Sequence, residues 1–271
     1  MSTIVQLLVI LSTYAGCNKN AATDVVQPSQ VDSIPAIPGW TLVWNDEFSG
    51  VMVDPAKWEY EVNGDGGGNN ELQYYTSRSQ NSYIDSGALV IEARKEDYLG
   101  KGYTSARMRT KLKGDWTYGR FDIRAKLPYG QGLWPAIWML PTDSEYGGWP
   151  LSGEIDIMEL LGQETDKVYG TIHFASGTGA HQQSGGSMTL AKGTFAEDYH
   201  TFTVVWDTAG ITWYVDGVNY FTTAHQKPFD KRFHILLNVA VGGDWPGSPD
   251  AFTTFPQKMY VDYVRVYTKS N

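Results

Sequence analysis

Three acidic side chains lie close together in one short apolar segment, residues 153–162 (GEIDIMELLG), at Glu154, Asp156 and Glu159. Alternate residues of a strand share a face, so strict alternation would place Glu154 and Asp156 together and Glu159 on the opposite face. A bulge with Met158 as the extra residue would return Glu159 to the face of the other two. No Lys or Arg lies within the segment to neutralise the acids. Their mutual repulsion should therefore raise the pKa of at least one carboxyl group.

This pattern favours glycoside hydrolysis over a solvated acidic surface. Ile155 and Ile157 alternate with the acids, so the expected strand has a buried side. Like charges on its other face add nothing to stability. Glycosidases use two carboxyl groups, of which one attacks the sugar or activates water and the other protonates the departing oxygen. A carboxyl group with a raised pKa can supply that proton near neutral pH.

The elements that must hold these acids are strands, because hydrophobic residues recur with a period of two almost everywhere. Residues 121–127 (FDIRAKL), 201–207 (TFTVVWD) and 211–217 (ITWYVDG) all alternate, whereas helical periodicity is nearly absent. Residues 168–174 and 234–241 place polar and aromatic side chains on one face of a strand. We predict an all-β fold, a β-sandwich of the jelly-roll type with two packed antiparallel sheets and an open cleft on the concave face.

The chain is predicted to divide into residues 1–17, a signal peptide, 18–38, a flexible linker, and 39–271, the β domain. The apolar run at 4–11 is too short to span a bilayer. It is followed by Tyr-Ala-Gly-Cys, which resembles a bacterial lipoprotein cleavage site with Cys17 as the lipidated residue. An ordinary secretory signal is the alternative. In either case we expect export, to the outer surface or periplasmic face of a bacterial envelope or into the medium.

The overall composition limits the kinds of partner that the protein is expected to bind. The formal net charge is −9 and the sequence pI is about 5.0, which argues against a nucleic-acid partner. With a single cysteine the chain can form no internal disulfide, and we expect a monomer. Aromatic residues make up 14% of the chain, more than a core alone would need, and flat rings suit the faces of sugars. A polysaccharide is the expected partner.

At Glu154 to Glu159 the sequence EIDIME resembles the active-site signature of glycoside hydrolase family 16, in the variant with one extra residue before the last Glu. The resemblance covers nearly the whole domain. The further matching segments are WNDEFSG (44–50), NNELQYYT (69–76), YGRFDIRAKLPYGQGLWPAIWMLP (118–141), YGTIHF (169–174), VGGDWPG (241–247) and VDYVRVY (261–267).

The resemblance implies roles for the acids. Glu154 corresponds to the nucleophile, Glu159 to the general acid/base, and Asp156 to the acid that shapes the pKa and position of its neighbours. It implies double displacement with retention, without a catalytic cofactor. Residues 134–141 (WPAIWMLP) and 241–247 (VGGDWPG) are most similar to laminarinases, so the expected enzyme is an endo-β-1,3-glucanase, with mixed-linkage glucans as further substrates. The alternatives are an agarase-like β-galactan hydrolase and a non-catalytic glucan-binding lectin on the same fold.

Several residues are expected to bind the sugar chain. Trp134 and Trp138 are four residues apart and share a strand face, and Pro135 between them suits an edge strand. Trp245 lies on a Gly/Pro loop, where an indole could serve as a sugar platform. The polar candidates facing the trough are Asn70, Arg109, His173 and Asn238.

Metal binding is expected away from the cleft. We expect no His or Cys partner near His173, which argues against a transition-metal site there. The resemblance implies instead a structural Ca²⁺, held through the segment containing Glu47 and through Asp262 of the last strand. Oxygen ligands suit that ion, and a solvated acidic pair is the alternative.

Overall fold

The computed structural model describes residues 34–270. The chain divides into two compact units, of which Ala36–Asn271 contains every strand. The predicted signal peptide, Cys17 and most of the predicted linker lie outside the described residues. Within residues 34–270 there is no helix of the length and apolar character that crossing a membrane requires.

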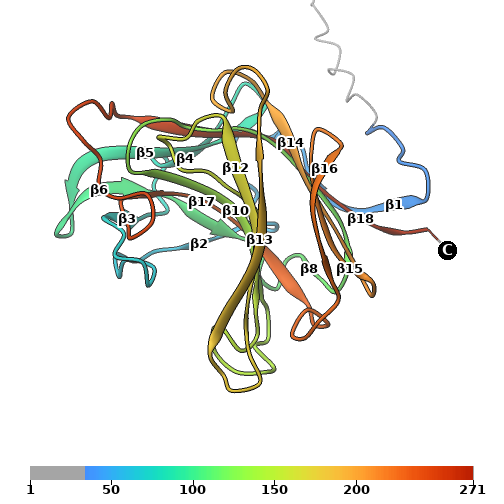
Figure 1. The fold of residues 1–271 in the computed structure, drawn as a ribbon. Coiled ribbons are helices and arrows are strands. Elements are labelled where there is room, and N and C mark those ends of the chain that lie inside the picture. The colour runs from blue at the N-terminus through green and yellow to red at the C-terminus, as the bar shows by residue number, and fades with distance from the viewer. Residues whose placement is uncertain (1–33, 271) are drawn as a thin grey trace, which may run out of the picture. The chain divides into compact units, whose positions relative to one another are not determined.

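The predicted all-β sandwich is confirmed: the described residues form strands and turns in two packed sheets, without a helix (Figure 1). The ten-stranded sheet runs in the order β16 (Val218–Ala224), β15 (Gly210–Val215), β14 (His200–Asp207), β9 (Gly119–Lys126), β18 (Gln257–Lys269), β5 (Ala88–Tyr98), β6 (Lys101–Ser105) and β3 (Gln73–Tyr75), with β1 (Trp40–Asp46) beside β18 and β4 (Ser82–Asp85) beside β5. All its pairs are antiparallel except β3 with β6.

The eight-stranded sheet carries the acidic segment. Its order is β13 (His181–Thr189), β12 (Lys167–Ala175), β11 (Glu154–Glu159), β10 (Leu133–Pro141), β17 (Phe233–Val241), β7 (Arg107–Arg109) and β2 (Glu59–Glu61), with β8 (Asp115–Trp116) beside β17. Every pair in this sheet is antiparallel.

The core lies between the two sheets and follows from the alternation in the sequence. In β9, Phe121 and Ile123 are fully buried in this core. In β14, the indole of Trp206 packs edge-on against Phe233 of β17, with ring centroids 5.4 Å apart. Alternate side chains of each strand therefore pack between the two sheets. The side chains on the other face of β10, β11 and β12 point away from this core and can line a binding site.

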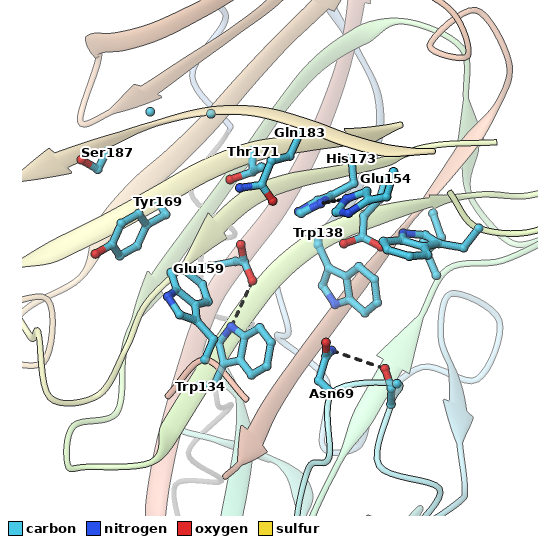
Figure 2. Close-up of a pocket in the computed structure, with 18 of the residues that line it drawn as sticks. Asn69, Trp134, Trp138, Glu154, Glu159, Tyr169, Thr171, His173, Gln183 and Ser187 are labelled. Carbon is cyan, nitrogen blue, oxygen red and sulfur yellow. Dashed lines mark hydrogen bonds between the residues drawn. The ribbon is translucent and has the colours of Figure 1, made fainter. Parts of the chain in front are cut away.

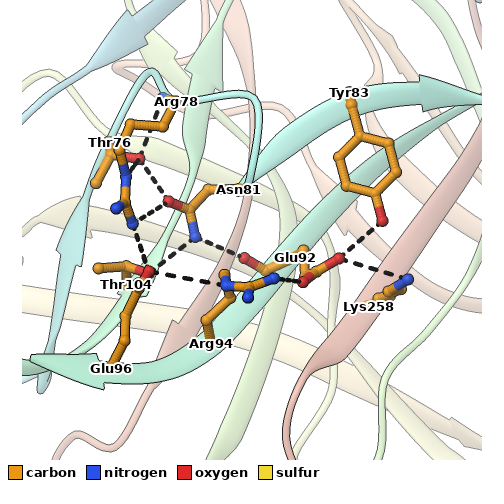
Figure 3. A network of polar contacts seen from close by, with 9 residues as sticks. All are labelled: Thr76, Arg78, Asn81, Tyr83, Glu92, Arg94, Glu96, Thr104 and Lys258. Atoms are coloured by element: carbon orange, nitrogen blue, oxygen red, sulfur yellow. Dashed lines mark hydrogen bonds and ion pairs between the residues drawn. The ribbon is translucent and has the colours of Figure 1, made fainter.

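A buried polar network stabilises the corner formed by β4, β5, β6 and β18 (Figure 3). Glu92 of β5 accepts a hydrogen bond of 2.7 Å from the Tyr83 hydroxyl and pairs with Lys258 at 3.4 Å. Asn81 donates to Thr104 and accepts from the Thr76 hydroxyl at 2.6 Å. Because Thr76 directly follows β3, this network fixes the strand whose preceding loop borders the cavity described below.

Pro135 was expected on an edge strand, and this prediction is wrong. β10 lies between β11 and β17 in the middle of its sheet. The carbonyl oxygen of Pro135 accepts from the Leu160 amide at 3.3 Å, so the proline nitrogen also faces the β11 side, just past the end of β11 at Glu159. The missing N–H therefore interrupts no ladder bond with β11, which is why a central strand tolerates this proline.

Candidate active site

The register of β11 against β12 confirms a bulge between Asp156 and Glu159. Asp156 pairs with Thr171, and Glu159 pairs with Tyr169. Three steps along β11 thus match two steps along β12, so β11 carries one extra residue. Glu159 consequently lies on the same face as Glu154, and both border one cavity.

The bulge differs in one detail from the prediction that Met158 is the extra residue. Against β10, Met158 pairs with Ile137 and Asp156 pairs with Trp138, which leaves Ile157 without a partner. Both Ile157 and Met158 are buried in the core. The two apolar residues together form the bulge, because the hydrophobic core accepts both side chains.

The cavity above β11 has a volume of about 890 Å³ (Figure 2). Strands β10 to β13 form its floor and one wall, and loops 67–69 and the loop carrying Trp245 close its other sides. Its aromatic and acidic lining residues are Trp134, Trp138, Trp149, Glu154, Glu159, Tyr169 and Trp245. Carboxyl groups flanked by flat rings suit a sugar chain, because rings can cover sugar faces while the acids reach the bond between two sugars.

Burial and mutual repulsion raise the pKa of all three acids. Burial, followed by the charge of Asp156, raises the pKa of Glu154 to about 8. Burial, followed by the charge of Glu154, raises the pKa of Glu159 to about 7. Burial raises the pKa of Asp156 well above its usual range, with the charge of Glu159 adding to the rise. The three groups cannot all ionise near neutral pH, so the cluster retains protons available for transfer.

His173 lies opposite Glu154 in the β11–β12 ladder and touches the acid cluster. Its Nε2 is 3.2 Å from Asp156 Oδ2, and its positive form would lower the pKa of Glu154. Its Nδ1 is 2.9 Å from Nε2 of His181, and the two rings stack. The expectation that no second histidine lies near His173 is therefore wrong, because β12 and β13 pair as a hairpin that brings residue 181 alongside.

One cluster in residues 34–270 has the composition of a metal site. Ligand atoms of Glu154, Asp156 and His173 lie within 4.8 Å of one another. Two of these groups, Glu154 and Asp156, belong to the acid cluster of the cavity, so a metal there would compete with the proton chemistry that the raised pKa values favour.

The predicted tryptophans line the cavity. Trp134 donates its indole N–H to Glu159 Oε1 at 3.0 Å, which orients this carboxyl group (Figure 2). Trp245, 42% exposed, packs edge-on against Trp134 and Tyr169 at centroid distances of 5.7 and 5.0 Å. Trp138 lies under the guanidinium of Arg107 at 4.5 Å.

Two predicted polar residues lie outside the cavity. Asn70 is exposed and donates to Asp244 Oδ1 at 2.9 Å, whereas its neighbour Asn69 borders the cavity. Arg109 is held by ion pairs to Glu59 and Glu61 on β2 and does not line the cavity.

Arg107 occupies the place expected for Arg109. It lies on the same face two residues earlier in β7, pairs with Asn238 in the ladder and borders the cavity. Alternation could not choose between the two arginines, because residues two apart share a face. The covering of Trp138 by Arg107 distinguishes them in the structure.

Asn238 is buried beneath the cavity and supports it from below. Its Oδ1 accepts the indole N–H of Trp138 at 2.7 Å, and its Nδ2 donates to the Tyr75 hydroxyl at 3.2 Å. Tyr75 in turn donates to Glu71 at 3.1 Å. Sequence reasoning missed Glu71 and Tyr75 as supports of Trp138, although both lie in the segment NNELQYYT.

The residues expected to hold Ca²⁺ do not fit the ion through their side chains. Glu47 pairs with Arg265 at 2.8 Å, and Asp262 pairs with Arg124 at 2.7 Å. Each carboxylate is thus neutralised by its own guanidinium. Within the described residues neither belongs to a cluster of three or more carboxylate, histidine or cysteine ligands.

Comparisons of the sequence and of the structure with known proteins point to one family. The sequence profile of "Glycosyl hydrolases family 16" matches residues 69–265. A "Beta-glucanase" from Rhodothermus marinus is 44% identical over 95% of this chain and 92% of its own length. The "Glucan endo-1,3-beta-glucosidase A1" of Niallia circulans is 43% identical over 94% of this chain, which spans 42% of that longer protein. The crystal structure of the laminarinase from Rhodothermus marinus superposes with a TM-score of 0.81 at 45% identity, covering 87% of this chain and 100% of the other.

Proposed function

Because the chain belongs to glycosyl hydrolases family 16, we propose that it is a retaining endo-β-1,3-glucanase that cleaves internal bonds of laminarin-type glucans. One observation carries the chemistry: Glu154 and Glu159 are brought to one face of β11 by a bulge and border the same aromatic cavity. The relatives named as an endo-1,3-β-glucosidase and a laminarinase support the β-1,3 linkage.

The residues act in two steps. Glu159, protonated, donates its proton to the glycosidic oxygen while the Glu154 carboxylate attacks the anomeric carbon, so the bond to the departing sugar breaks and a glycosyl-enzyme forms. Glu159, now a carboxylate, then takes a proton from water as that water displaces Glu154. Two inversions give net retention. The raised pKa of Glu159 keeps its proton available for the first step. The pKa of Glu154 is raised as well, and the positive charges of His173 and Arg107 oppose that rise and favour its carboxylate form.

Asp156 and Trp134 adjust these two groups. The charge of Asp156 raises the pKa of Glu154, and burial holds the pKa of Asp156 itself well above its usual range. Trp134 donates to Glu159 and lowers its pKa, which keeps Glu159 able to act as a base in the second step.

A neutral glucan suits the cavity better than a sulfated galactan. Arg107 is the one Lys or Arg among the lining residues that the structure describes, and it is paired with Glu61 at 2.9 Å. A polyanionic substrate would meet two glutamates there with little positive charge to balance its sulfates. A purely binding lectin would have no use for three buried, mutually repelling acids.

The proposal is tested by analysing products from laminarin, lichenan and agarose side by side, with the anomeric configuration followed by NMR. We expect laminarin to give internal cleavage products whose first-formed anomer is β, with slower cleavage of lichenan. Cleavage of agarose alone would replace the glucanase proposal with the galactan hydrolase. Binding of laminarin without hydrolysis by any preparation would favour the lectin.

We also propose export of the protein, because a polysaccharide is too large to enter a cell intact and residues 4–11 have the character of a signal sequence. A Cys17→Ser variant, compared with the parent by cell fractionation and fatty-acid labelling, tests the lipid anchor. Loss of label and release from the membrane fraction are expected. If neither protein is labelled by fatty acid and both fractionate alike, an ordinary secretory signal would be the better explanation of the N-terminal segment.

A further inference from the structure

A tryptophan of the opposite sheet contacts the backbone of the catalytic strand at its bulge. Trp213 of β15 is fully buried, and its indole Nε1 donates to the carbonyl oxygen of Asp156 at 2.8 Å. A strand carbonyl normally accepts from a neighbouring strand of its own sheet. Here the donor comes across the core from the ten-stranded sheet.

The bulge explains why this carbonyl needs a distant donor. Asp156 is the last residue in register before the extra residue, and Ile157 after it has no partner on β10 or on β12. A bulge locally disrupts the ladder and can leave a buried carbonyl without its usual donor. The indole of Trp213 satisfies that carbonyl at the point where the strand departs from regular pairing.

Gly170 makes room for the indole. It lies in β12 between Tyr169 and Thr171, and therefore faces the bulge on the core side of the sheet. A Cβ at Gly170 would lie 2.7 Å from Trp213 Nε1 and closer still to a carbon of the same ring, and it would also meet the Tyr220 hydroxyl. The backbone of Gly170 is not left-handed, so space and not conformation requires a glycine here.

The neighbouring strand β13 also carries a glycine at a point where an aromatic ring approaches its backbone. Gly186 of β13 pairs with Gly170, and a Cβ on Gly186 would lie 2.8 Å from the side chain of Phe221. The Phe221 ring packs against Trp213 with centroids 5.1 Å apart. Paired glycines thus admit two aromatic rings of the ten-stranded sheet against the backbones of β12 and β13, beside the catalytic strand.

We propose that Trp213, seated on Gly170, is a positioning residue for the general acid: it holds the bulge that presents Glu159 to the cleft. This inference rests on the proposed hydrolase function. Glu159 lies at the end of the bulge opposite to Asp156, so a change in the tilt of the Asp156 carbonyl moves the Glu159 backbone directly. Displacement of an acid from the glycosidic oxygen slows proton donation more than it weakens binding.

The test compares substrates that differ in their need for an acid. Trp213→Phe keeps an aromatic side chain at this position but removes the N–H and shrinks the bicyclic indole to a single ring. We expect kcat/KM on laminari-oligosaccharides to fall about ten-fold, the size expected for one lost buried hydrogen bond. On a dinitrophenyl β-laminarioside, whose leaving group departs without protonation, kcat/KM should stay within about two-fold of the parent. Equal losses on both substrates would overturn the proposal.

Trp206→Phe is the matched control. Trp206 is also fully buried in the ten-stranded sheet and also donates its indole N–H to a backbone carbonyl, that of Phe229, at 3.1 Å. That carbonyl does not belong to the catalytic strand. We expect both variants to lower the melting temperature, but only Trp213→Phe to lose activity selectively on the oligosaccharide. The same selectivity in Trp206→Phe would show that any loss of core packing produces it.

Gly170→Ala gives an independent test that keeps the indole. The added methyl group meets both the Trp213 ring and the Tyr220 hydroxyl, and the hydroxyl lies at the end of a side chain that can move aside. Displacement of Trp213 should therefore dominate, so the effect should match that of Trp213→Phe, and the double variant should be no worse than either single one. Additive losses would contradict a shared mechanism. Should these variants fail to fold, replacing Trp213 with benzothienylalanine removes the N–H and retains the ring shape. An inactive parent enzyme would refute the hydrolase proposal itself, whereas an active parent with an unaffected Trp213 variant would refute only the positioning role.

Discussion

We expect Glu159→Gln to stabilise the protein above neutral pH while nearly abolishing hydrolysis. Burial and the charge of Glu154 raise the pKa of Glu159 from 4.5 to about 7. A carboxyl group with a raised folded-state pKa favours folding when protonated, below pH about 4.5, and this contribution is lost as the pH rises through about 7. At alkaline pH the ionised Glu159 therefore lowers the free energy of unfolding of the wild-type protein, and a neutral glutamine removes this effect.

The magnitude follows from the shift. At about 1.4 kcal/mol per pKa unit, a rise from 4.5 to about 7 corresponds to roughly 3 kcal/mol of unfolding free energy. Glu154 and Asp156 share the repulsion, so the gain measured in one variant should be somewhat smaller than this. Glutamine can still accept the indole N–H of Trp134, so the substitution changes the charge and largely conserves the packing.

Urea denaturation at about pH 4 and about pH 9 measures the effect. At low pH the variant and the wild type should unfold at similar urea concentrations. At high pH the variant should be more stable by about 2–3 kcal/mol. Glu145→Gln is the control, because this exposed carboxylate pairs with Lys231 on the surface and its loss should bring no comparable gain. Parallel pH dependence of Glu159→Gln and wild type would refute the reasoning.

Three further outcomes test the assignments. Glu154→Ala should abolish laminarin hydrolysis while oligosaccharide binding by calorimetry persists, and a fully active variant would remove Glu154 as nucleophile. Asp156→Asn removes a charge that raises the pKa of Glu154, so the acid limb of kcat/KM should move to lower pH as the rate falls; an unmoved limb would exclude this tuning role. Trp245→Ala should raise KM about five-fold with a smaller change in kcat, since one sugar-facing ring is lost; an unchanged KM would place sugar binding elsewhere.

The bulge was predictable because two constraints conflict in so few residues. Alternation alone separates Glu159 from Glu154, whereas the absence of neutralising cations makes a shared catalytic face the better explanation of the acids. The structure resolves the conflict with one extra residue between Asp156 and Glu159. It assigns that residue to an Ile157–Met158 pair, which the sequence could not decide since both side chains are equally suited to the core.

The alternation of residues predicts which face of a strand a side chain occupies. It does not predict which of two neighbouring residues reaches the cavity, or where a strand lies within its sheet. Asn70 adopts a left-handed backbone conformation, with φ of 58°, and its side chain turns to Asp244 while Asn69 borders the cavity. No pattern in two adjacent asparagines shows which of them adopts that conformation. Pro135 failed as an edge marker because its effect depends on where β11 ends, a property of the neighbouring strand.

The contact between Trp213 and Asp156 means that the EIDIME signature alone does not determine the geometry of the acid. The bulge requires a donor from the ten-stranded sheet, and that donor requires a glycine on β12. A chain with the three acids and a bulky residue at position 170 would keep the signature but could not seat the indole. Residues 170 and 213 should therefore be considered together with Glu154, Asp156 and Glu159 when the site is transferred to another β-sandwich, because the extra residue needs its support from the facing sheet.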